Sequence, residues 1–255
     1  MSQATQLSKW FHCIQPNPQA VMRLFCFHFA GGGASAFHQW SKELPDSIEV
    51  VAIQLPGREG RLFEPPFTSL APLLTALVDE LRPHLGEKPF AFFGHSMGAI
   101  VSFEVAQYLK QHDQVEPQYL FVSGYPGPHT YTNDDPYYTK SDEDLIKDLV
   151  KLGGTPQELL ENEELMRLVL PTVRADFEVC DTYEYNAGVL LDCPIFAFGG
   201  WQDEMLSESG MQAWGELTRA EFAWQMFEGD HFYLLEQNNR TALLTTILNT
   251  VRTGR

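Results

Sequence analysis

A serine lies at the centre of a glycine-flanked pentapeptide, Gly94-His95-Ser96-Met97-Gly98. The apolar run 89–93 precedes it and a helix-like run, 99–106, follows it, which predicts a strand, a tight turn and a helix. The two glycines leave room where these elements crowd together, so Ser96 can adopt a strained conformation with its hydroxyl exposed. The Met97 N–H then lies at a helix N-terminus, where it can stabilise a developing oxyanion. The pattern favours a nucleophilic serine over a glycine-rich loop without chemistry.

A serine hydroxyl is a poor nucleophile that needs a histidine base and an acid to orient that base. In the nucleophile elbow of α/β-hydrolases these partners follow the serine, acid first and histidine second. Three histidines follow Ser96, namely His112, His129 and His231. His112 lies at the charged end of the helix after the serine, and His129 has acidic residues before it only on or just after that helix. We therefore predict His231, in a loop before the last helix, as the base.

The acid is expected in the loop after the apolar strand 195–198, where Asp203 lies. Asp192 precedes that strand and would lie at the wrong end of the sheet. Glu204 remains an alternative to Asp203, and Asp230 is expected to serve the local turn beside the histidine.

A second oxyanion donor is expected in the loop after the early strand 23–27, because ligands meet the carboxyl ends of parallel strands. Ala30 is our choice, with Gly31 as the alternative register. Glycines 31–33 predict a loop in which the backbone approaches another group closely.

The elements that position these residues alternate between strands and helices, which predicts a mainly parallel, doubly wound sheet of the α/β-hydrolase type in a single domain, 1–255. The strands are apolar throughout, as expected when both faces are covered. Predicted strands lie at 23–27, 48–53, 89–93, 119–122, 195–198 and 222–227. Predicted helices lie near 69–85, from 99 to a charged end at 110–114, and around 239–252.

Residues 125–190 contain no convincing strand and predict a helical insertion that covers Ser96 as a lid. Its first helix would begin at Ser141, a capping residue, and end at Gly153-Gly154. The second would begin at Thr155-Pro156, with proline in the first turn.

The chain has 255 residues and a formal net charge of −17, with 17 basic and 34 acidic residues. This charge disfavours nucleic acids and anionic membrane surfaces as partners. No apolar stretch reaches the length of a membrane span, the polar N-terminus lacks a signal-peptide core, and four cysteines form no paired motif. We expect a reduced, monomeric cytoplasmic protein without a disulfide, metal or cofactor.

A set of segments spread along the chain matches one known family. They are Phe29-Ala30-Gly31-Gly32, Leu55-Pro56-Gly57-Arg58-Glu59-Gly60-Arg61, Gly94 to Ala99, Leu152-Gly153-Gly154-Thr155-Pro156, Leu170-Pro171, Arg174-Ala175-Asp176, Tyr183, Asp203 and Gly229 to Phe232. Together these segments resemble the type II thioesterases that accompany nonribosomal peptide and polyketide synthases. One departure is His28, where that family usually carries proline.

The resemblance implies hydrolysis of acyl thioesters on the phosphopantetheine arm of carrier domains, through an acyl-enzyme on Ser96. It makes acyl or peptidyl carrier domains the expected partners. The implied role of the enzyme is to clear stalled or misprimed chains from these domains. The same triad would also serve a small-ester hydrolase or an acyltransferase, and an inactive protein that only binds acylated carriers is a further alternative.

Carrier domains of this kind are acidic, so a protein of net charge −17 needs a local contact with them. We expect docking through apolar lid surface and through Arg58 or Arg61, unless these arginines only fix loops through carboxylate pairs. Phe29 and Phe232 are further candidates for substrate contact. We also expect a structural ion pair within Arg174-Ala175-Asp176.

Overall fold

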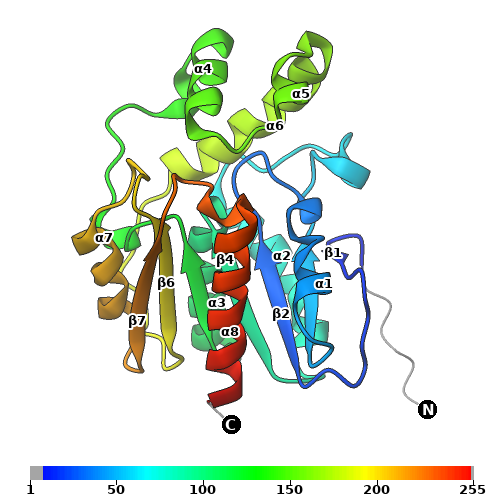
Figure 1. Ribbon diagram of the computed structural model, residues 1–255, viewed down its shortest axis with the longest axis vertical. Coiled ribbons are helices and arrows are strands. Elements are labelled where there is room, and N and C mark those ends of the chain that lie inside the picture. Colours follow the sequence, from blue (N-terminus) through cyan, green and yellow to red (C-terminus); the bar gives the residue numbers. More distant parts are fainter. Residues whose placement is uncertain (1–7, 254–255) are drawn as a thin grey trace.

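The computed structural model describes residues 8–253, which form a seven-stranded sheet with helices on both faces (Figure 1). The strand order is β1-β3-β2-β4-β5-β6-β7, and every neighbouring pair is parallel except β1 with β3. The strands are β1 (Phe11–His12), β2 (Met22–Phe27), β3 (Ile48–Ile53), β4 (Phe90–His95), β5 (Leu120–Ser123), β6 (Ile195–Gly200) and β7 (Phe222–Phe227). The six predicted strands are all present. The antiparallel β1 was not predicted because two residues are too few to display a period.

Helices α2 and α3 cover one face of the sheet, and α1 and α8 cover the other (Figure 1). Each face has its own cluster of buried apolar side chains, which is why β2, β3, β4 and β5 are buried along their whole length. The helices of these layers are α1 (Trp40–Glu43), α2 (Leu70–Leu85), α3 (Met97–Asp113), α7 (Glu208–Gln212) and α8 (Gln237–Thr253). The doubly wound arrangement predicted from the sequence is confirmed.

The lid, residues 125–190, lies between β5 and β6 and stands above one end of the sheet (Figure 1). It contains three α-helices rather than the two predicted: α4 (Asp142–Leu152), α5 (Gln157–Leu160) and α6 (Glu163–Asp181). Ser141 caps α4 by accepting the Asp144 N–H. The third helix is capped by Asn162, whose side chain accepts two N–H groups of the first turn, and this cap divides the predicted second helix into α5 and α6.

Short 3₁₀ helices occupy several of the loops between these elements. They are η1 (Ala34–Phe37), η2 (Glu59–Arg61), η3 (Pro128–Thr130), η4 (Tyr137–Thr139), η5 (Ala213–Leu217) and η6 (Tyr233–Leu235). Within residues 8–253, no helix combines the length and the apolar character needed to cross a membrane.

Candidate active site

Ser96 occupies the turn between β4 and α3 with φ 55° and ψ −119°, a conformation that costs a non-glycine residue energy. The surrounding glycines are required by close backbone approach. A Cβ at Gly94 would lie 2.0 Å from the carbonyl oxygen of Gly98, and one at Gly98 would lie 2.1 Å from that of Phe27. The Ser96 N–H donates to Ser123 O of β5 over 2.7 Å, which ties the strained turn to the neighbouring strand.

His231 and Asp203 form a buried hydrogen-bonded pair, with 2.7 Å between His231 Nδ1 and Asp203 Oδ2. Each residue is only 5% exposed. The other carboxylate oxygen accepts the Met205 N–H over 3.0 Å, so the orientation of Asp203 is fixed. Because a carboxylate only accepts, the imidazole carries its proton on Nδ1 and leaves Nε2 free as a base. Ser96 and His231 line the same cavity, which has a volume of about 450 Å³.

The alternative acids and histidines lie elsewhere. Glu204 forms an exposed ion pair with Lys151, and the Asp230 carboxylate accepts an N–H of its own turn. His112 is exposed at the end of α3, and His129 lies 3.2 Å from a carboxylate oxygen of η5. Asp203 is therefore the carboxylate that the tertiary structure brings to His231.

Behind His231 lies a buried polar chain that sequence reasoning did not find. His95 Nδ1 is 2.9 Å from Ser123 Oγ, which is 2.7 Å from the hydroxyl of Tyr233. The His95 ring centroid lies 5.1 Å from that of His231. Burial, followed by the neighbouring His231, holds the pKa of His95 well below its usual value, so His95 is neutral. The histidine within the pentapeptide was the only signal for this chain.

The loop after β2 places Ala30 and Gly31 against the cavity. The Gly31 N–H donates to Asp176 Oδ2 over 2.7 Å and is thus engaged. Within residues 8–253, neither the Ala30 nor the Met97 N–H has an acceptor. Of the two registers considered for the second oxyanion donor, the hydrogen bonding therefore favours Ala30.

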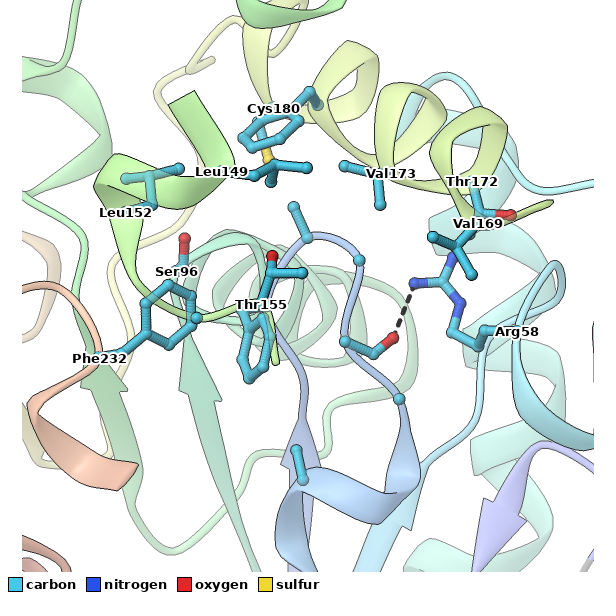
Figure 2. Close-up of a pocket in the computed structure, with 18 of the residues that line it drawn as sticks. Arg58, Ser96, Leu149, Leu152, Thr155, Val169, Thr172, Val173, Cys180 and Phe232 are labelled. Atoms are coloured by element: carbon cyan, nitrogen blue, oxygen red, sulfur yellow. Dashed lines mark hydrogen bonds between the residues drawn. The ribbon is translucent and has the colours of Figure 1, made fainter. Parts of the chain in front are cut away.

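Arg58 and Arg61 are buried, 6% and 5% exposed, which contradicts their predicted contact with a docking partner. Arg58 donates to both oxygens of Asp176 and to Gly32 O, the latter over 3.1 Å (dashed line in Figure 2). Arg61 donates to a backbone carbonyl of its own loop and stacks over Trp10, 4.3 Å from guanidinium carbon to ring centroid. Both arginines fix loops, which is the alternative stated for them.

The prediction of an ion pair between Arg174 and Asp176 is wrong. Arg174 pairs with Asp142 of α4 at 2.5 Å, whereas Asp176 pairs with Arg58. Residues two apart on a helix point in different directions, so Arg174 and Asp176 cannot meet.

The cavity is mainly apolar and lies between the lid and the loops at the end of the sheet (Figure 2). Phe29 and Phe232 form part of its wall, with ring centroids 4.7 Å apart and an edge-to-face arrangement. The lid contributes apolar side chains to the opposite wall, among them Leu149, Leu152, Met166, Val169, Val173 and Phe177. This arrangement can hold an acyl chain with its carbonyl beside Ser96.

The sequence of the chain matches a known protein family. Residues 22–250 match the thioesterase domain family. Gramicidin S biosynthesis protein GrsT of Aneurinibacillus migulanus is 45% identical over 236 residues, covering 92% of each chain. Thioesterase PikA5 of Streptomyces venezuelae is 36% identical, covering 89% of this chain and 81% of PikA5.

Solved structures agree with the sequence comparison. The type II thioesterase BorB from the borrelidin biosynthetic cluster superposes with a TM-score of 0.87 at 35% identity, covering 94% of this chain and 96% of BorB. The resemblance found in the sequence is thus confirmed, and so is the α/β-hydrolase fold. The chain belongs to the thioesterase domain family and is a thioester hydrolase.

Proposed function

We propose that this protein hydrolyses acyl thioesters on the phosphopantetheine arms of carrier domains, with Ser96, His231 and Asp203 as its catalytic triad. The observation that carries the proposal is the juxtaposition of three features at one cavity: a strained serine, the buried His231–Asp203 pair and an apolar wall formed by the lid. We further propose that the protein needs no cofactor, since serine, histidine and water suffice for this chemistry. We also propose that it acts as a monomer in the cytoplasm.

In the acylation step, Ser96 Oγ attacks the thioester carbonyl carbon as its proton passes to His231 Nε2. Asp203 holds the imidazole by its Nδ1–H and stabilises the imidazolium that forms. The Ala30 and Met97 N–H groups donate to the oxyanion, and each such donor is worth on the order of 3 kcal/mol in the transition state. The C–S bond then breaks, the pantetheine thiol leaves with a proton from His231, and the acyl group stays on Ser96.

In the deacylation step, His231 takes a proton from a water molecule, whose oxygen attacks the acyl-serine carbonyl. The same two N–H groups stabilise the second oxyanion. Ser96 leaves with the proton returned by His231, and the free acid departs.

The carrier-bound substrate is supported by the relatives, since BorB is named as a type II thioesterase of a biosynthetic cluster and GrsT as a gramicidin S biosynthesis protein. With both candidate arginines buried, we propose that a carrier domain docks on exposed apolar side chains of the lid. These are Val150 of α4 and Leu165 and Leu168 of α6.

The test is mass spectrometry of a panel of acyl-carrier proteins incubated with the wild type, Ser96→Ala and a matched control, Ser209→Ala. Ser209 lies exposed on α7, away from the cavity. We expect the wild type and the control to release free acid and to show a transient acyl adduct on Ser96, whereas Ser96→Ala shows neither.

A short free ester is tested alongside the carriers. Preferential turnover of the free ester would indicate the small-ester hydrolase instead. Transfer of the acyl group to another acceptor in place of water would indicate an acyltransferase. Carrier binding without acid release by the wild type would indicate the inactive binding protein.

A further inference from the structure

We propose that Asp176 of lid helix α6, held by Arg58, is a positioning residue for the oxyanion hole. It fixes the backbone on one side of Ala30, so that the lid and the hydrolytic site form one mechanical unit. The inference rests on the proposed function, because it takes Ala30 as an oxyanion donor.

The peptide group that joins Phe29 to Ala30 contains the Ala30 N–H and is held at its carbonyl. Phe29 O lies 2.8 Å from His28 Nδ1 and accepts the Gly32 N–H over 2.9 Å. The N–H of a trans peptide points opposite to its carbonyl, so these contacts direct the Ala30 N–H. A carbonyl that accepts two hydrogen bonds also polarises its peptide group and makes the N–H a stronger donor.

The peptide group after Ala30 is held at its N–H by the lid. Gly31 donates to Asp176 Oδ2 over 2.7 Å and has φ +76°, a conformation that favours glycine. A Cβ at Gly31 would lie 2.9 Å from Val173 Cγ2, so α6 packs directly on this loop (Figure 2). Because both neighbouring peptide groups are anchored, Ala30 has little freedom to rotate its N–H away from the cavity.

Arg58 holds Asp176 in place. Asp176 is 2% exposed, and a buried carboxylate needs a partner that offsets the cost of its burial. Both of its oxygens accept from Arg58, whose guanidinium also donates to Gly32 O and Pro56 O. The guanidinium therefore connects α6 to the loops that follow β2 and β3.

This linkage explains why a carboxylate 145 residues from the oxyanion loop matters for the reaction. Displacement of α6 would release the Gly31 N–H, which would leave it free to compete with Ala30 for the oxyanion. The lid would thereby control the catalytic rate as well as the shape of the cavity.

The test compares two paired substitutions that avoid an unpaired buried charge. Asp176→Leu with Arg58→Met replaces the pair with apolar side chains and removes the acceptor for Gly31, whereas Asp176→Asn with Arg58→Gln keeps an amide oxygen at that place. The control, Asp142→Asn with Arg174→Gln, removes a second charged pair of the lid, which does not touch the oxyanion loop. Thermal unfolding confirms that each variant is folded.

Three quantities separate positioning from a general structural effect: kcat for an acyl-carrier substrate, KM for the same substrate, and the affinity for a short alkylboronic acid. The Ser96 Oγ adds to boron as its proton passes to His231, and the tetrahedral anion occupies the oxyanion hole. We expect the apolar pair to lower kcat and boronate affinity about 10- to 100-fold with KM within about threefold. The amide pair should restore both to within about fivefold of the wild type.

A measurement on the wild type does not depend on the folding of any variant. Amide NMR should show that the Ala30 N–H signal shifts on addition of the boronic acid while the Gly31 N–H stays protected from exchange. A shift of Gly31 in place of Ala30 would overturn the proposal, as would an apolar pair with the kcat and boronate affinity of the wild type. If Ser96→Ala retains hydrolysis, the proposed function fails, whereas an inactive Ser96→Ala beside a fully active apolar pair refutes the positioning role alone.

Discussion

Gly154 of the lid packs against Phe232 so closely that a single added methyl group should disturb both activity and stability. A Cβ at Gly154 would lie 2.1, 2.2 and 2.5 Å from three ring carbons of Phe232, the residue after His231. The φ of Gly154 lies outside the left-handed region, so an alanine there suffers from the collision and not from backbone strain. Gly154→Ala therefore tests the packing of the lid on the site.

Carbon atoms pack at about 3.5 to 4.0 Å, so the ring or the lid must move by roughly 1.5 Å. The Phe232 ring lies 5.0 Å from His231 and 4.7 Å from Phe29, centroid to centroid, and movement of the ring displaces the base. Misplacement of about 1 Å in an active site can cost 100-fold in rate. We expect kcat/KM to fall about 10- to 100-fold and the free energy of unfolding to fall by about 1 to 3 kcal/mol.

The assay combines acyl-carrier hydrolysis with urea unfolding for Gly154→Ala, Phe232→Leu and the double variant. The shorter leucine removes the ring atoms that the methyl group would strike, so the double variant should be no worse than Phe232→Leu alone. Gly86→Ala is the matched control, because nothing lies within 4 Å of a Cβ at that position.

Two results would refute this reasoning. One is a Gly154→Ala variant with the kinetics and stability of Gly86→Ala, which would mean that the lid does not rest on Phe232. The other is strict additivity of the two substitutions, because residues in direct contact must show a coupling energy.

Three further predictions follow from the site and its surroundings. Asp203→Asn should lower kcat about 10³- to 10⁴-fold in steady-state assays with little change in KM, because the amide favours the wrong tautomer of His231; a loss below tenfold would contradict the triad. Gly98→Ala should not yield folded protein, judged by circular dichroism, because its Cβ would lie 2.1 Å from a backbone oxygen of Phe27; a folded, active variant would show that the elbow can relax. Burial, followed by Arg58, lowers the pKa of His28 to about 4, so between about pH 6.5 and 4 the unfolded chain binds a proton that the folded chain does not. The free energy of unfolding therefore falls by about 3 kcal/mol as the pH drops through that window. Urea unfolding of His28→Asn should lack this part of the decline, and an unchanged pH dependence in the variant would contradict the prediction.

Much of the candidate site could be predicted because its residues lie in short segments with recognisable local patterns. The glycines around Ser96 and the apolar runs before the catalytic loops are features of short segments, and the chain order of serine, acid and histidine restricts the choice of partners. The structure then brought Asp203 and His231 together as expected.

The predictions that failed concern partners of charged residues and short elements. Arg174 and Asp176 are neighbours in sequence, yet each pairs with a residue far along the chain, because helix geometry sends them to different sides. Arg58 and Arg61 looked like surface cations, and only the folded chain shows that both are buried. The two-residue strand β1 gives too little periodicity to be recognised, and the predicted second helix of the lid is divided at Asn162 into α5 and α6.

The sequence by itself determined the fold class and the strand-turn-helix around Ser96, because local propensity and strand patterning carry that information. It also gave the chain order of the three residues that we propose as the triad. The tertiary structure decided which backbone N–H of the loop after β2 is engaged and which is left for the proposed oxyanion hole. That choice depends on a hydrogen bond between Gly31 and Asp176, 145 residues apart. Such a contact follows from the packing of α6 on the loop after β2 and has no counterpart in any local pattern, so the part that we propose for the lid in the oxyanion hole depends on the folded chain alone.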